Sequence, residues 1–245
     1  MAAGHNHNGM VLYGDHNESN RTCTDLHDLA RFNGGQMTGW KPLRHHMDNI
    51  SKALLQFLDK DRAKYTTAQE AGLTVLKGLL KSNIPQNPQA IVAALDKVLF
   101  DGLLHGRLSV SVIDLKGNCE GETYFSQDRV PRTPFATIKV HDFNDYRNQP
   151  KERRVHIISS LVHEMCHAFL LIYGCDGRQC ATRDSVANGI GFTGHGPVWV
   201  RIADEAENNF HAFICPMIMP GFEFPNPLGI PQAVKEEREY RKKWF

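Results

Sequence analysis

The sequence is organised around the motif His163-Glu164-x-x-His167, which lies within a largely apolar stretch. An α-helix repeats every ~3.6 residues, so side chains at positions i and i+4 share one face. On a helix, His163 and His167 can therefore reach the same metal ion from successive turns. Glu164 lies about 100° further round the axis, where it can hold a water molecule without binding the metal. The apolar flanks predict a buried helix over about 151–173.

Two histidines and a glutamate in this order are typical of a metalloprotease site, provided that they lie on a helix. A catalytic zinc ion has three protein ligands and one open position, so a third ligand is needed. The best candidate is His195, because the glycines on either side let the backbone come close to a metal. Pro197 is suited to the first turn of a helix that would follow. Glu205 and Glu207 on that predicted helix are rivals, since carboxylates also bind zinc.

The residues before this motif predict helices first and then strands. Apolar residues at spacings of three and four predict helices at about 47–58, 71–80 and 88–103. Asn87 and Pro88 are suited to the N-cap and first position of the third helix. Alternating residues predict strands at 108–113, 122–125 and 135–140. We expect an α+β fold in which a small three-stranded antiparallel sheet packs on helices.

The overall charge is nearly balanced, with 28 basic and 27 acidic residues among 245. No global positive field is available for binding nucleic acid, so any such binding needs a local basic patch. Glu237–Arg241 and Glu239–Lys243 are spaced as i,i+4 pairs, which favours a solvated, salt-bridged helix over a nucleic-acid site near the C-terminus. The local candidates are Arg147, Lys151, Arg153, Arg154, Arg238, Arg241, Lys242 and Lys243.

Neither a signal peptide nor a membrane span is expected from the sequence. The start is polar, and no apolar run approaches the ~18–20 residues of a membrane helix. We therefore expect an intracellular protein, nuclear or cytoplasmic, with its six cysteines reduced. Cys175 and Cys180 are either a second metal site or ordinary loop cysteines, and their loose spacing favours the second interpretation.

Three segments in this order resemble the SprT-like zinc metallopeptidase family, whose Spartan-like members act in DNA–protein crosslink repair. The resemblance covers about residues 88–210. It implies a zincin-like minimal metalloprotease core with Zn²⁺ bound by His163, His167 and His195, and with Glu164 as the catalytic residue. The segments are Leu99-Phe100-Asp101-Gly102-x-Leu104, Leu161-Val162-His163-Glu164-Met165-Cys166-His167-Ala168 and Gly194-His195-Gly196-Pro197-Val198-Trp199.

The chain differs from that family in three respects. The segment 173–193 is longer and richer in Gly, Asp and Asn, there is no cysteine framework for a zinc-binding subdomain, and the net charge is only +1. We expect a weakly structured segment at 1–45, a helical extension at 46–84 and a metallopeptidase domain at 85–215. A C-terminal extension with a terminal helix is expected at 216–245.

The function predicted from this resemblance is zinc-dependent hydrolysis of peptide bonds, with Glu164 as general base for the attacking water. Its partners would be protein substrates, including DNA-bound or crosslinked ones, and DNA held by the local basic patches. One alternative is a non-catalytic module, stabilised by zinc, that binds protein or DNA. Another is a hydrolase that acts on a different substrate. The sequence predicts no oligomeric state.

Overall fold

The structure is a computed structural model with mixed α+β architecture. It describes most of the chain from residue 45 onwards. The described residues are 45–59, 64–80, 87–116, 119–126, 135–175, 187–191, 193–218 and 228–244. The segment predicted to be weakly structured, 1–45, lies outside them except for its last residue. So do Cys180 and much of the long loop before residue 193.

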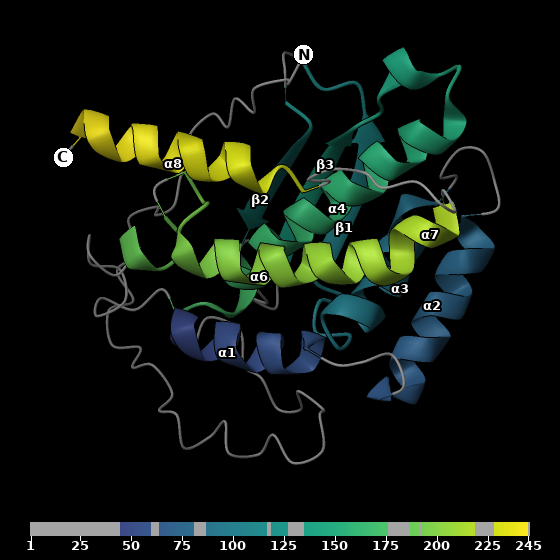
Figure 1. Ribbon diagram of the computed structural model, residues 1–245, viewed down its shortest axis with the longest axis horizontal. Coiled ribbons are helices and arrows are strands. Elements are labelled where there is room, and N and C mark those ends of the chain that lie inside the picture. The colour runs from purple at the N-terminus through teal and green to yellow at the C-terminus, as the bar shows by residue number, and fades with distance from the viewer. Residues whose placement is uncertain are drawn as a thin grey trace.

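The central element is α4 (Pro150–Tyr173), a helix of 24 residues whose proline lies at the start, where no backbone N–H is needed. It lies between the sheet on one side and α6 on the other (Figure 1). By length and composition α4 is the one helix among the described residues that could span a membrane, yet 89% of its most apolar window is buried inside the protein. Such burial is typical of a core helix, which explains why its surface is apolar on almost every side.

The sheet contains β1 (Leu108–Ile113), β2 (Gly121–Ser126) and β3 (Phe135–His141) in the order β1-β3-β2. The prediction of an antiparallel sheet is wrong in one pairing, because β1 runs parallel to β3 while β2 is antiparallel to it. β3 lies between two strands that are consecutive in sequence. The link 114–120 has only to cross two strand spacings, roughly 10 Å, which a few extended residues can span.

The sheet has one buried face and one more exposed face. Ala136, Ile138 and Val140 of β3 are fully buried, and the residues that alternate with them are only partly buried. The buried face packs on α4, and β2 contacts the same helix. Alternation with period two thus brings one side of β2 directly against the helix that carries the histidine motif.

Three helices precede the sheet: α1 (Met47–Leu58), α2 (Thr67–Leu79) and α3 (Pro88–Leu99). The Asn87 side chain accepts a hydrogen bond from the Ala90 N–H at 2.9 Å, as an N-cap does. α2 begins earlier than the apolar pattern predicts, because Thr66 and Gln69 form a capping box. α2 packs on α3, and α1 packs on α6.

The remaining helices lie on either side of α4 in the chain. A short 3₁₀ helix, η3 (Asn144–Tyr146), precedes it. After it come α6 (Pro197–Asn209), the π-helix η4 (Phe210–Ile214), α7 (Cys215–Ile218) and the terminal helix α8 (Ile230–Trp244). Side chains from the helices before and after the sheet join one hydrophobic core around α4. This core fixes the helix on which the candidate site is built.

Candidate metal centre

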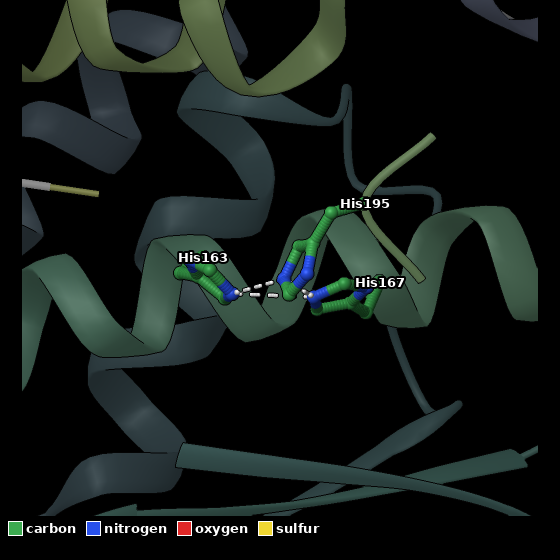
Figure 2. A group of neighbouring side chains, drawn as sticks. All are labelled: His163, His167 and His195. Carbon is green, nitrogen blue, oxygen red and sulfur yellow. Dashed lines mark hydrogen bonds between the residues drawn. The ribbon is translucent and has the colours of Figure 1, made fainter. Parts of the chain in front are cut away.

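The Nε2 atoms of three histidines meet in the buried interior. His163 and His167 come from successive turns of α4, and His195 comes from the loop that ends at the start of α6 (Figure 2). The Nε2–Nε2 distances are 3.2 Å for 163–167, 3.2 Å for 167–195 and 3.3 Å for 195–163. All three side chains are buried, with His195 only 1% exposed. The structure therefore brings together the residues that the sequence analysis selected.

The spacing of these nitrogen atoms fits a small tetrahedral cation. Zn–N bonds of ~2.05 Å at tetrahedral angles place two ligand nitrogens about 3.3–3.4 Å apart. The observed triangle is close to that size on every edge. Three imidazole nitrogens this close together also need a cation or shared protons between them, because their lone pairs repel one another. The group can hold a metal ion.

The second ring nitrogen of His163 fixes its orientation. Nδ1 lies 2.7 Å from the backbone oxygen of Leu228, which can only accept a hydrogen bond. Nδ1 must therefore carry the proton, so the neutral ring presents a bare Nε2 to the site. Trp199 of α6 packs against all three rings and stacks on His167, with ring centroids 5.1 Å apart and planes 19° apart. This apolar wall limits how far the rings can turn.

The loop that carries His195 is held tightly against itself. Gly194 has a φ of 88°, in the left-handed region that favours glycine. Gly196 donates a hydrogen bond from its N–H to Ile190 O, and a Cβ at position 196 would lie 2.3 Å from Gly191 N. The glycine on each side of His195 therefore allows a sharp turn or a close backbone contact. Together they direct the imidazole inward.

Glu164 follows His163 on α4, and strand β2 holds its side chain. Its Oε2 accepts a hydrogen bond from Thr123 Oγ1 at 2.5 Å, and Oε1 lies where a side chain at Gly121 would otherwise be. Burial raises the pKa of Glu164 to about 8, while the Thr123 hydrogen bond acts in the opposite direction. A divalent cation at the histidines would also lower this pKa. The Glu164 side chain is thus fixed in position, one residue along α4 from the candidate ligand His163, and it is more basic than an exposed carboxylate.

The rival carboxylates do not join the histidines. The group of ligand atoms around His163 and His167 contains His195, but neither Glu205 nor Glu207. Glu207 Oε1 lies 3.7 Å from Nε2 of His211, four residues further on in η4. Cys166 is fully buried and burial raises the pKa of its thiol, so it packs as a small hydrophobic residue.

The basic residues predicted as DNA contacts divide into two groups. Arg154 is buried and donates to Leu80 O, while Arg153 donates to Asp142 O at 2.6 Å. Arg241 bonds to Glu237, as its i,i+4 spacing predicts. These three are directed to partners within the chain. The five exposed ones are Arg147, Lys151, Arg238, Lys242 and Lys243.

Several residues of the site are absent from the predicted set. Thr123 and the Leu228 carbonyl are 41 and 65 positions from their partners in α4, so no local pattern connects them. Glu237 reaches the site through Thr193, 44 positions away. Trp199 follows His195 by four residues at the start of α6, and this spacing is a signal that could have indicated a contact.

No protein-family model, curated protein or solved structure matches this chain. The interpretation of the site therefore depends on its own residues: three convergent histidines, the buried glutamate that follows the first of them and the polar groups that orient these side chains.

Proposed function

We propose that the protein is a zinc-dependent endopeptidase with a zincin-like core of the SprT type. The observation that carries this proposal is the triangle of Nε2 atoms on His163, His167 and His195, together with the buried Glu164 that follows His163 on α4 and is held by Thr123. A structural zinc site needs ligands but has no use for a neighbouring base. A hydrolytic site needs both.

In the proposed reaction, Glu164 accepts the proton of the attacking water and delivers it to the leaving amine. Thr123 keeps the carboxylate in place during both transfers, because its hydroxyl donates to Oε2 at 2.5 Å. When bound, zinc supplies a Lewis acid that polarises the scissile carbonyl and acidifies water. The Leu228 carbonyl keeps the Nε2 of His163 free of protons.

Protein substrates are supported by the position of β2. Among the described residues β2 pairs only with β3, so it is an edge strand. The opposite edge strand, β1, is hydrogen-bonded through its backbone to the side-chain amide of Gln89. An extended peptide can add to an open strand edge through backbone hydrogen bonds. Because Thr123 of β2 contacts Glu164, such a peptide would run close to the catalytic carboxylate.

The decisive variant is Glu164→Gln, which keeps the shape of the side chain and removes its basicity. We expect it to retain zinc and to lose cleavage of casein and histone substrates, by at least ~100-fold. Zinc content by elemental analysis and product formation by gel electrophoresis check this. A variant that cleaves at the wild-type rate would refute the assignment. Chelation of the wild-type protein should abolish cleavage, and re-addition of zinc should restore it.

The third ligand is tested by comparing His195→Ala with Glu205→Ala. His195 provides one of the three convergent nitrogens, whereas Glu205 lies outside that group. We expect zinc content to fall strongly in the first variant and to stay at the wild-type level in the second. The reverse result would show that the carboxylate is the ligand.

A non-catalytic zinc module is the second candidate, and the burial of the site favours it. His163, Glu164, His167 and His195 are each between 1% and 4% exposed. If zinc only holds the fold, the wild-type protein will show no cleavage, and Glu164→Gln will behave as the wild type does.

Assays with and without single-stranded DNA test whether DNA-bound proteins are the substrates. Exposed basic residues such as Arg147 and Lys242 would allow the protein to contact DNA.

A further inference from the structure

The terminal helix α8 reaches the metal centre through one buried carboxylate. Glu237 is only 5% exposed although it lies on the most polar of the described helices. Its Oε2 accepts two hydrogen bonds from Thr193, from the backbone N–H at 2.8 Å and from Oγ1 at 2.7 Å. Its Oε1 accepts a third from Nε of Arg241 at 2.8 Å. With three donors, one of them charged, this carboxylate is fixed in position.

The Thr193 hydroxyl connects that carboxylate to a metal ligand. Oγ1 lies 3.4 Å from Nδ1 of His195, which is at the long end for a hydrogen bond. A hydroxyl has a single hydrogen, and here Glu237 takes it, since a carboxylate can only accept. The lone pairs of Oγ1 are left to accept from Nδ1–H of His195. Glu237 therefore sets the direction of both hydrogen bonds: Thr193 donates to Glu237, and His195 donates to Thr193.

We infer that Glu237 is a positioning residue for the metal centre. Acting through Thr193, it selects the His195 tautomer that carries its proton on Nδ1 and presents a bare Nε2 to His163 and His167. The inference rests on the proposed zinc centre and adds the C-terminal helix to it. The contact of Leu228 O with His163 Nδ1 at 2.7 Å comes from the residues just before α8. The segment 228–237 thus orients two of the three ligands.

A merely structural role for Glu237 would give different results. In that case the carboxylate would only attach α8 to the loop around residues 187–196, as Arg241 does through its bond to Ala187 O. Loss of Glu237 would then lower the stability of the protein with and without metal equally. Loss of a positioning residue changes the affinity for the metal and the geometry of its ligands.

The experiment compares zinc affinity in Glu237→Gln, Thr193→Val and Thr193→Ser with that of the full-length wild type, using a competing chromophoric chelator. The control is Glu239→Gln, an exposed carboxylate on the same helix. We expect zinc affinity to fall about 10–100-fold in Glu237→Gln and Thr193→Val, the usual effect of losing a group that orients a metal ligand. Thr193→Ser keeps the hydroxyl and should bind zinc as the wild type does, as should the control.

The visible spectrum of the Co²⁺-substituted protein gives a second readout, because it responds to the ligand geometry. We expect altered absorption bands in Glu237→Gln and Thr193→Val, with circular dichroism showing that both are folded. Wild-type zinc affinity and a wild-type spectrum in these two variants would overturn the inference, and so would an equal loss in Glu239→Gln. A wild-type protein that takes up no zinc would instead refute the proposed function, before any variant is compared.

Discussion

Gly121 of β2 keeps open the space that the Glu164 carboxylate occupies. A Cβ at residue 121 would lie 2.6 Å from Glu164 Oε1, a contact that real Cβ atoms essentially never make. We expect Gly121→Ala to displace the carboxylate while the three histidines stay in place. Zinc content should therefore be unchanged while kcat falls by about 100-fold, the usual effect of an ångström-scale misplacement. Steady-state kinetics and metal analysis of the purified variant measure both quantities.

Gly78 provides the matched control, because an added Cβ there meets nothing within 4 Å. On the surface of α2, Gly78→Ala should keep full activity and raise the free energy of unfolding by up to ~1 kcal/mol. Unchanged kcat in Gly121→Ala would show that β2 does not set the position of Glu164.

Single residues differ in how well the sequence predicts their place in the site. Helical periodicity is enough to pair His163 with His167. His195 is predicted as the third zinc ligand because glycines flank it and a helix is expected to begin at Pro197. Thr123 and Glu237 could not be predicted, because each meets its partner across more than 40 residues. Contacts of this kind depend on how strands and helices pack, and packing leaves no fixed spacing in a sequence.

Helices and strands are predicted well where apolar residues repeat or alternate regularly. They are predicted poorly where a polar contact determines the residue at which an element ends. The predicted strand 108–113 is β1, and the predicted helix 151–173 begins at residue 150. α3, however, ends at Leu99, whereas the predicted helix continues to about residue 103. The Asp96 carboxylate explains this, because it accepts a hydrogen bond from Leu104 N–H at 3.0 Å and holds the following turn against the helix.

Asp96 also makes the stability of this helix end dependent on pH. Burial raises the pKa of Asp96 from 3.8 to about 7, although the hydrogen bond from Leu104 acts in the opposite direction. The folded state therefore takes up a proton between these two values. Its stability falls as pH rises from about 4 to about 7, and above that range the loss is complete. Ionised Asp96 would cost up to roughly 4 kcal/mol by this linkage.

Asp96→Asn should remove that dependence, because the amide oxygen can still accept from Leu104 and cannot ionise. We expect the variant to gain stability relative to wild type as pH rises from 4 to 8, with most of the gain between pH 5 and 7. Urea unfolding of both proteins at several pH values measures the difference. Two stability curves that stay parallel over this range would show that folding does not raise the pKa of Asp96.

At the scale of the molecule, the described helices and strands share one hydrophobic core around α4. The sequence predicts a helical extension at 46–84 with helices at about 47–58 and 71–80, and in the structure the apolar faces of α1 and α2 join the core that surrounds α4. Asn209 of α6 adds polar contacts, since its amide donates to Leu58 O at the end of α1 at 3.3 Å and accepts from the OH of Tyr65, just before α2, at 2.8 Å. Periodicity shows which face of a helix is apolar, but not which element will cover it.

This connection predicts how zinc should affect the stability of the protein as a whole. At a free zinc concentration of 1,000 times Kd, a ligand that binds only the folded state stabilises it by about 4.1 kcal/mol. For a chain of this size we expect Tm to rise by roughly 8–16 °C in a single transition when zinc is added to the chelated protein. Differential scanning calorimetry with and without chelator measures the shift, and His195→Ala should show little of it.

The shape of the calorimetric transition then tests how the chain is divided. Because α1 packs on α6 and α6 follows the loop that carries His195, the N-terminal helices should unfold together with the metal centre. An early transition whose temperature does not respond to zinc would mean that residues 46–84 form a separate unit, as the sequence suggested. An unchanged Tm for the whole protein in zinc and in chelator would contradict the metal centre itself, because a site built from α4 and the loop before α6 cannot bind tightly without stabilising both.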